Sequence, residues 1–384
     1  MFRYRHLSRW AAAALCVLVP LGAVHAGPRF WGWKSTIRAN VGVRYSTNID
    51  SNNAGRSDFT YRGGLDIDLS RDRRDSIWNL NLGTDLFRFS SETDENSNDF
   101  RATLRFEPNQ PRFSSRFQGN GSIGWVRSTD ADPVLGTRLQ RNRFTFRYGA
   151  IYTANTKWSL GADGSYNWED PQNRDSGNLA RVSNWRLSST AYYRYSPKLA
   201  FTAGGSYARS SGSRNRTFQS DNTTVSVSTG VDGQITPKIS GSVSVGWQIR
   251  DAERETDTES APFVSASLAW SVNSRTSVAL SASSDFSTLV SDQLTETQSI
   301  SLQYNRQLGI GINLNALASF QTSRIRSFGL TRTDDSYSAS LTASYRLNDW
   351  SALSLQANWN DQRSSLPAFS FDRQAVELRM RFTY

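Results

Sequence analysis

The chain lacks the side chains on which most enzyme sites and metal centres depend. Its one cysteine, Cys16, and its two histidines, His6 and His25, all lie within the first 26 residues. Once that segment is removed, the remaining chain has neither a thiol nor an imidazole and cannot form a disulfide. Nucleophiles activated by histidine, histidine general bases and nearly all transition-metal sites are therefore excluded. We predict a protein that is not an enzyme, with no catalytic residue, no cofactor and no metal ion.

The first 26 residues have the composition of an export signal. Arg3, Arg5 and Arg9 precede an apolar run over residues 10–24, and small residues lead up to Ala26. This arrangement predicts a signal peptide, residues 1–26, with cleavage after Ala26. The alternative is an uncleaved membrane anchor, which is disfavoured because the run falls short of the ~20 residues that a spanning helix needs. The exported domain would then be residues 27–384.

Long apolar runs and helical periodicity are missing from the rest of the chain. No later stretch reaches the roughly 18 apolar residues that mark a transmembrane helix, so none is predicted. The whole chain has a net charge of +10, and because the first 26 residues hold three arginines and no acid, the exported domain carries +7. Its basic residues are scattered and no nucleic-acid motif is present, so we expect no nucleic-acid partner.

What the chain has instead is a repeated hairpin unit. Eight short turns alternate with nine longer polar connections, and together they join eighteen predicted strands. The short turns lie at 70–76, 107–111, 153–157, 195–198, 235–238, 271–275, 304–308 and 347–350. The longer connections lie at 46–57, 90–98, 128–137, 170–180, 210–220, 251–258, 287–293, 324–334 and 360–370. None is much longer than about a dozen residues, which predicts that none folds inward to constrict so large a barrel.

Apolar and polar side chains alternate within the predicted strands. In the first strand Ile37, Ala39 and Val41 oppose Arg38 and Asn40. A soluble sandwich or propeller would bury the apolar face, whereas a transmembrane barrel turns it to lipid. Strands of roughly 10–14 residues, longer than is usual in globular sheets, favour the barrel, as do the aromatic residues near strand ends. The predicted fold class is all-β: a transmembrane, antiparallel up-and-down β-barrel of about 18 strands.

The last predicted strand, "QAVELRMRFTY", ends the chain on an aromatic residue. It resembles the C-terminal strand of bacterial outer-membrane barrels, whose alternating apolar residues are read by the barrel assembly machinery. The resemblance implies an assembly signal made of Val376, Leu378, Met380, Phe382 and Tyr384. Those families usually end in phenylalanine, so Tyr384 is a departure from their pattern.

Hairpins such as "YSPKLAFTAGGSY" and "ITPKISGSVSVGW" carry a wider resemblance. The exported domain resembles the "putative β-barrel porin" family found beside exopolysaccharide genes. The resemblance implies a multi-pass barrel in the outer membrane of a Gram-negative cell. It also implies contact with membrane lipids and lipopolysaccharide, and association with polysaccharide and export-complex proteins. It supplies no catalytic residue.

The inward-facing positions predict a lumen of two kinds. The early strands and the last one place arginines inward, namely Arg38, Arg44, Arg62, Arg101, Arg105, Arg116, Arg143, Arg147, Arg186, Arg194, Arg379 and Arg381. Strands further along the chain place serine, threonine, asparagine and glutamine there, for example Ser240, Ser242 and Ser244. Two interpretations stay open: the arginines face an anion, or they pair with inward acids such as Asp66, Asp85 and Glu377.

The functional hypothesis is a pore that lets a polar or anionic solute, such as a secreted exopolysaccharide, cross the outer membrane. The alternative is a non-conducting scaffold barrel that organises an envelope or export complex.

Overall fold

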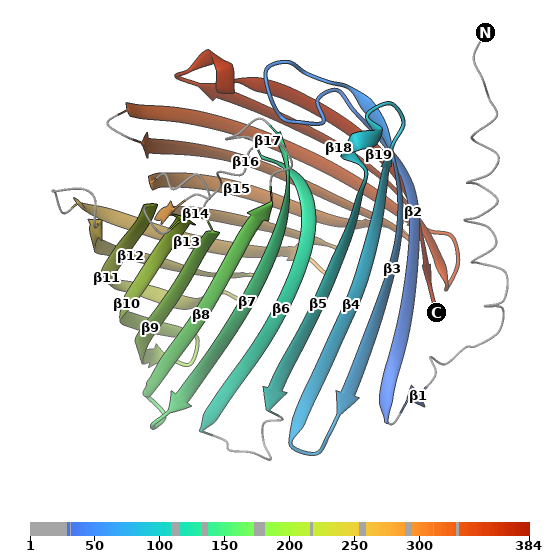
Figure 1. The fold of residues 1–384 in the computed structure, drawn as a ribbon. Coiled ribbons are helices and arrows are strands. Elements are labelled where there is room, and N and C mark those ends of the chain that lie inside the picture. Colours follow the sequence, from blue (N-terminus) through green and yellow to red (C-terminus); the bar gives the residue numbers. More distant parts are fainter. Residues whose placement is uncertain are drawn as a thin grey trace, which may run out of the picture.

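The computed structural model is a β-barrel of long antiparallel strands (Figure 1). The structure describes residues 29–30, 32–108, 116–132, 137–172, 181–215, 218–252, 259–288, 294–309, 311–327 and 330–384. The predicted signal peptide, residues 1–26, and its cleavage at Ala26 lie outside these ranges.

Nineteen strands and two short 3₁₀ turns make up the described fold. They are β1 (Arg29–Phe30), β2 (Trp33–Ser46), β3 (Asp58–Asp72), β4 (Ser76–Phe89), η1 (Thr93–Glu95), β5 (Ser97–Pro108), β6 (Phe117–Asp132), β7 (Thr137–Thr153), β8 (Trp158–Gln172), β9 (Arg181–Ser196), β10 (Leu199–Asn215), β11 (Phe218–Thr236), β12 (Ile239–Ala252), β13 (Glu259–Asn273), β14 (Thr276–Thr288), β15 (Leu294–Leu308), β16 (Ile312–Ser327), β17 (Leu330–Arg346), β18 (Ser351–Ser364), η2 (Pro367–Phe369) and β19 (Phe371–Thr383).

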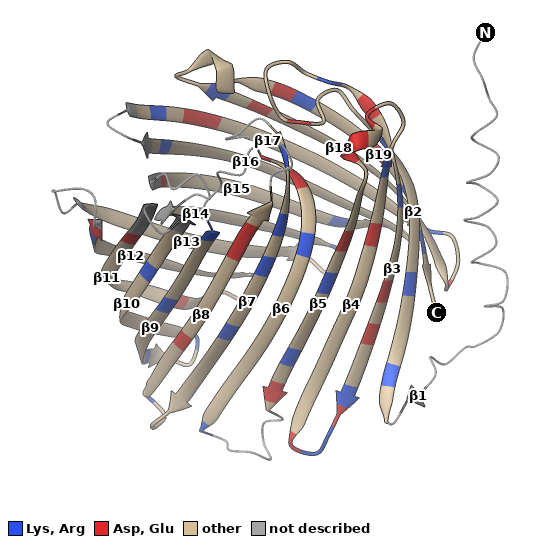
Figure 2. Ribbon diagram, in the orientation of Figure 1, with Lys and Arg blue, Asp and Glu red and all other residues tan. Residues whose placement is uncertain are grey.

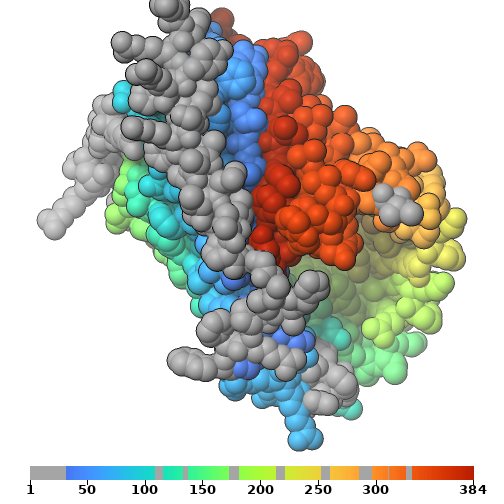
Figure 3. Space-filling view, turned by 90° about the vertical axis from the view of Figure 1, so that its right-hand side faces the viewer, coloured from blue at the N-terminus to red at the C-terminus, as the bar shows by residue number. Residues whose placement is uncertain are grey.

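The eighteen long strands, β2–β19, close on themselves. Each pairs with its neighbour in sequence, and β19 pairs with β2 from Thr383↔Arg38 to Ala375↔Ser46. Figure 3 shows the blue N-terminal strand beside the red C-terminal ones. Closure gives every strand two neighbours, which a sheet surrounded by lipid requires. The predicted fold class is confirmed. Within the described ranges, no helix has the length and apolar character needed to cross a membrane.

The register separates the two faces of the wall. Residues directly opposite in an antiparallel pair share a face, so Arg38, Asp66, Gly83 and Arg101 lie on one face of β2–β5. A hollow of about 420 Å³ is lined by residues of the same face from β2 to β6 and from β19, among them Arg62, Asp85 and Glu377. A hollow shared by so many consecutive strands lies on the concave side. The polar face is therefore the lumen, and the opposite face carries the exposed apolar side chains.

The outer face is apolar and ringed by aromatic pairs. Exposed side chains there include Val41, Leu65, Val227 and Leu378. Aromatic rings on neighbouring strands contact one another at both ends of the wall. Examples are Tyr45 with Phe59 (4.9 Å between centroids) and Trp185 with Tyr207 (5.0 Å) near the long-connection end, and Trp78 with Phe106 (4.6 Å) and Trp158 with Tyr193 (5.0 Å) near the short-turn end. Aromatic girdles at two levels are typical of membrane barrels.

Several longer connections are shorter than the sequence predicts. Residues 210–220 were expected as a loop, but β10 and β11 stay paired out to Asn215↔Phe218. The same holds for 324–334, where β16 and β17 pair out to Ser327↔Leu330. Polar composition misled here because strand pairing satisfies backbone groups whatever the side chains, so strands continue past the apolar band.

One short turn is displaced from its predicted position. The turn expected at 304–308 lies after Leu308, because β15 runs to that residue. Gly309 (φ 59°) and Gly311 (φ 85°) supply the left-handed backbone for the reversal. The end of the predicted turn at 107–111 lies outside the described residues.

The C-terminus lies at the short-turn end of the barrel. The amide of Thr383 donates to the carbonyl of Trp350, at the end of the 347–350 turn, and Tyr384 exchanges hydrogen bonds with Ile37. The strand β2 also begins at this end, beside the short turn that follows β3.

Candidate pore lining

Eleven of the twelve predicted arginines occupy inner-face positions of the strands. They are Arg38 and Arg44 on β2, Arg62 on β3, Arg101 and Arg105 on β5, Arg143 and Arg147 on β7, Arg186 and Arg194 on β9, and Arg379 and Arg381 on β19. The twelfth, Arg116, directly precedes β6. Figure 2 shows basic and acidic positions along the strands of this half.

Five of these arginines form ion pairs with acids among the described residues, and we call them the paired arginines: Arg38, Arg62, Arg101, Arg143 and Arg379. The hub of this network is Asp85, which is 3% exposed. Asp85 accepts hydrogen bonds from Arg62 (2.8 and 3.0 Å) and from Arg101 (2.6 Å). Arg101 also reaches Asp66, and Arg38 reaches Asp68. For these five, the interpretation as ion-paired arginines describes the structure.

The connection 47–57 reaches the lumen side of the wall. Ile49 is 2% exposed and lines the 420 Å³ hollow together with Arg44 and Arg62. Two hydrogen bonds brace the loop: Asn48 Nδ2 donates to the carbonyl of Asn52 (2.6 Å), and Arg373 Nη1 donates to Ser51 Oγ (3.0 Å). Ile49 of this loop therefore packs against the inner wall. That no loop constricts the barrel stays a prediction.

A second connection, between β4 and β5, forms ion pairs with this loop. Arg56 donates to Asp50 (2.6 Å) and to Glu92 (2.5 Å), and it also reaches Glu95 in η1 (3.3 Å). The hydrogen bond to Asp50 is the main cause that raises the pKa of the Arg56 guanidinium above its usual value. Glu92 and Glu95 of the 90–98 connection thus both bind Arg56. No group of acids among the described residues is arranged to hold a metal ion.

A different set of basic side chains forms an inclined row without acids. The row, which we call the cationic row, is Lys34, Ser70, Asn79, Arg105, Ser122, Arg147, Ser165 and Arg186, each directly opposite the next on strands β2 to β9. All four of its basic residues are exposed. Among the described residues none of the four has an acidic partner within 4 Å, and Arg186 instead donates to Ser206 Oγ (3.1 Å).

The cationic row climbs along the wall because the strands are staggered. Lys34 is the second residue of β2 counted from the short-turn end. Arg186 is the eleventh residue of β9 counted from the same end. The row therefore runs from near the short-turn mouth toward the long-connection mouth.

The opposite part of the wall carries a row of hydroxyls. The serine row is Ser242, Ser267, Ser281, Ser301, Ser319 and Ser338, each directly opposite the next on β12 to β17. Its members bond in pairs: Ser242 with Ser267 (2.8 Å), Ser281 with Ser301 (2.6 Å) and Ser319 with Ser338 (2.5 Å). The hydroxyls thus satisfy one another without any charged group.

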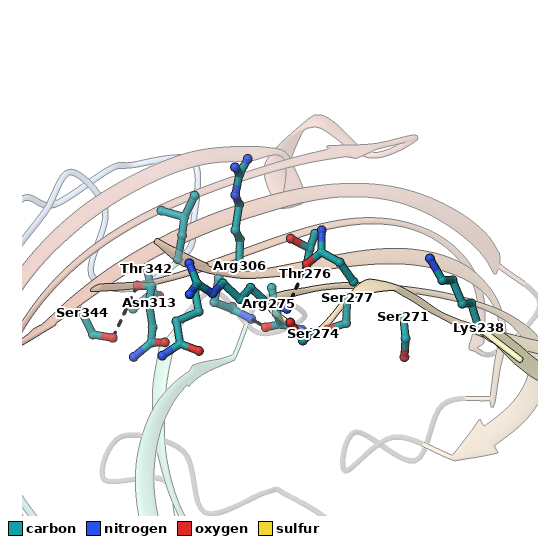
Figure 4. Close-up of a pocket in the computed structure, with 15 residues that line it drawn as sticks. Lys238, Ser271, Ser274, Arg275, Thr276, Ser277, Arg306, Asn313, Thr342 and Ser344 are labelled. Carbon is teal, nitrogen blue, oxygen red and sulfur yellow. Dashed lines mark hydrogen bonds between the residues drawn. The ribbon is translucent and has the colours of Figure 1, made fainter. Parts of the chain in front are cut away.

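A hollow of about 650 Å³ lies at the short-turn end of this serine-rich wall (Figure 4). Ser271, Ser277, Asn313 and Ser344 point to the same side of the sheet, whereas Arg306 points to the other. Ser344 Oγ lies 3.5 Å from the carbonyl oxygen of Asn313. The lining offers amides and hydroxyls, which suit hydroxylated solutes.

Sequence reasoning did not find the rows themselves. It found neither Lys34 nor Ser267, Ser319 and Ser338 as lining residues, although all share the inner-face parity of their strands. Counting positions across each short turn could have found them, because a turn of known length fixes the register of its hairpin. The displaced turn at 309–311 shows how one error in turn length would have spoiled that count.

The fold and its polar inner face define a porin-like β-barrel of the outer-membrane type. The family model described as "Putative beta-barrel porin 2" matches residues 185–384, a little more than half of the chain. The chain belongs to that family. The matched part contains the whole serine row, whereas the cationic row apart from Arg186 precedes it.

Solved structures share this fold at low identity. The FrpB iron transporter from Neisseria meningitidis (F5-1 variant) is 7% identical, with a TM-score of 0.51 over 92% of this chain and 82% of that one. A mutant of the ferric enterobactin receptor PfeA from Pseudomonas aeruginosa is 6% identical, with a TM-score of 0.50 over 91% and 80%. OpdK from the same species, solved with vanillate, is 10% identical, with a TM-score of 0.47 over 91% and 99%. Comparison with curated proteins gave no match.

Proposed function

We propose that this protein is a pore of the Gram-negative outer membrane through which a polar or anionic solute passes, with a secreted exopolysaccharide as the candidate solute. The observation that carries the proposal is the mainly polar inner face of a closed barrel, on which Arg105, Arg147 and Arg186 are exposed and have no acidic partner among the described residues. Membership in a porin family supports a transport role rather than catalysis.

The apolar outer face and its aromatic pairs fit a barrel embedded in lipid and in contact with lipopolysaccharide. In such barrels the short turns are periplasmic, so both ends of the barrel domain would lie in the periplasm. A tag at Gly55, where an added side chain meets no atom within 4 Å, should be labelled on intact cells. Tags at Pro197 and Pro237, in short turns, should be labelled only after lysis. The reverse pattern would contradict the proposed orientation.

Single-channel recording in planar bilayers tests the pore itself. A conducting barrel lined as described should pass current and prefer anions, because exposed arginines concentrate counter-charge. The preference should fade as salt rises, since the screening length falls from ~10 Å at 0.1 M to ~3 Å at 1 M.

The second candidate is a non-conducting scaffold for an envelope or export complex. The observation that favours it is the packing of 47–57 against η1 at one mouth, with Ile49 buried on the lumen side. Folded protein that passes no current at any voltage would establish this candidate over the pore.

A further inference from the structure

The arginines of the cationic row are distinguished by their arrangement: among the described residues they form no ion pair with an acid, and they lie in one line across β5, β7 and β9. Arg44, Arg194 and Arg381, the other predicted inner-face arginines for which no ion pair is seen among the described residues, lie outside this line.

The row that starts at Arg38, two inner-face positions along β2 from Lys34, passes through Asp66, Arg101, Arg143 and Glu169 and carries charges of both signs. The acids nearest to the cationic row along the same strands, each two residues from a member of the row, are Asp68, Asp72, Glu107 and Asp163. Asp68 pairs with Arg38, and among the described residues none of the four acids forms an ion pair within 4 Å with Arg105, Arg147 or Arg186.

We propose that the cationic row is a binding track for a linear acidic polysaccharide; this rests on the proposed pore function and names the solute class and its contact residues. Arg105, Arg147 and Arg186 lie on alternate strands β5, β7 and β9. Adjacent strands are ~4.8 Å apart, so successive arginines are separated by roughly 10 Å. One small anion cannot bridge that gap, but a chain with an anionic group on every second sugar can meet each arginine in turn.

The residues between the arginines fit the rest of such a chain. Ser122 and Ser165 lie directly opposite the arginines in the strand register, and Ser70 and Asn79 continue the pattern toward Lys34. Arginine holds a carboxylate through two parallel N–H donors, while serine and asparagine exchange weak hydrogen bonds with sugar hydroxyls. Because the row climbs from one mouth toward the other, a chain that moves from one arginine to the next also advances along the lumen.

The paired arginines are unsuited to this role. Arg101 and Arg62 already donate to Asp85, so binding a solute there would leave a nearly buried carboxylate without its partners. The serine row has the hydroxyls without the charge. The cationic row is the part of the described inner wall where unsatisfied positive charge and hydroxyl groups alternate in one line.

The test measures binding of a defined oligogalacturonate to the folded barrel, by current block where the barrel conducts and by fluorescence anisotropy of labelled ligand in detergent in every case. The triple variant R105S/R147S/R186S should bind roughly tenfold or more weakly, because charge-assisted hydrogen bonds to carboxylates are lost. The control K157S/K198S/R275S removes the same charge from short turns at one mouth and should bind like the unaltered protein. Both variants change exposed residues without ion pairs among the described residues, so both should fold.

Two further ligands decide what the row recognises. A neutral maltooligosaccharide of equal length should bind the unaltered protein and the row variant equally weakly. Polyphosphate, which has charge without hydroxyls, should bind more weakly than oligogalacturonate, and equal or tighter binding would overturn the assignment to a polysaccharide. Equal loss of oligogalacturonate binding in the control and the row variant would overturn the track. A barrel that passes no current but binds in a row-dependent way would refute the pore and leave the track standing.

Discussion

The inner wall of β2–β9 and that of β12–β17 satisfy their polar side chains with different chemical groups. Both must keep polar groups satisfied inside a barrel, and both do so across neighbouring strands. The first uses ion pairs centred on Asp85, while the second uses serine hydroxyls such as Ser281 and Ser301. Charges need partners of fixed geometry, whereas hydroxyls can exchange partners with water or solute at little cost.

The difference teaches which groups remain for a solute. In the ionic half, Arg38, Arg62, Arg101 and Arg143 bind acids. Among the inner arginines for which no ion pair is seen in the described residues, Arg105, Arg147 and Arg186 fall into one row. In the serine half no single side chain stands out, because each hydroxyl has an equivalent neighbour. We infer that the ionic half sets selectivity for charge and that the serine half provides a smooth, weakly binding surface.

The largest expected effect comes from breaking the ionic half at its hub. Asp85→Ala leaves Arg62 and Arg101 without their shared acceptor on the lumen wall. Breaking a buried ion pair on one side costs up to about 3–5 kcal/mol. Thermal unfolding in detergent, followed by heat-modifiable mobility, should show a clear loss of stability. Glu107→Ala, which removes an exposed acid with no ion pair among the described residues, should change it little; equal losses would contradict the role of Asp85 as a hub.

The next effect concerns the seam where β19 joins the two halves. Phe382 stacks on Trp350 (5.9 Å between centroids, 15° between planes) and is 9% exposed. Phe382→Asp places a charge on the outer face, which costs up to ~2–4 kcal/mol at the midplane of the bilayer and less near the interface. We expect loss of membrane-embedded, heat-modifiable barrel in cells. Deletion of Tyr384 should impair assembly as well, and normal assembly of both variants would rule out the predicted signal.

The sequence was sufficient for the architecture but not for the site. Alternation in segments such as 239–250 and the recurring turns gave the strand number and the two faces, because a period of two residues is a local property. Which inner arginines bind acids depends on register, which joins residues far apart in the chain. Arg62 and Asp85 are separated by a turn, and Arg62 and Glu377 (4.0 Å) by most of the chain. The buried position of Ile49 was equally out of reach, since it depends on the loop meeting η1 and β19.

Reversing the charge of the cationic row tests whether the arginines that form no ion pair with an acid set the ion selectivity. R105E/R147E/R186E should shift the reversal potential toward cation selectivity while the barrel stays folded, because lumen substitutions tune selectivity rather than stability. The measurement is the reversal potential in a salt gradient at 0.1 M and at 1 M, where screening should reduce the difference. Arg116 is left out because it lies before β6. An ion selectivity that stays unchanged after all three charge reversals would favour the scaffold barrel over the pore.

The smallest effect is expected in the serine row. S242A/S281A/S319A removes one hydroxyl from each of the three bonded pairs. A neutral hydrogen bond contributes about 0.5–1.5 kcal/mol, and here the remaining partners, Ser267, Ser301 and Ser338, are exposed or half-buried and can bond to water instead. Stability and ion selectivity should therefore stay close to those of the unaltered barrel. Passage of neutral oligosaccharides, followed by liposome swelling, should slow modestly because the apolar methyl groups offer no exchange of hydrogen bonds. A loss of stability as large as that of Asp85→Ala would show that the serine half is held as rigidly as the ionic half, and the contrast between the two walls would then fail.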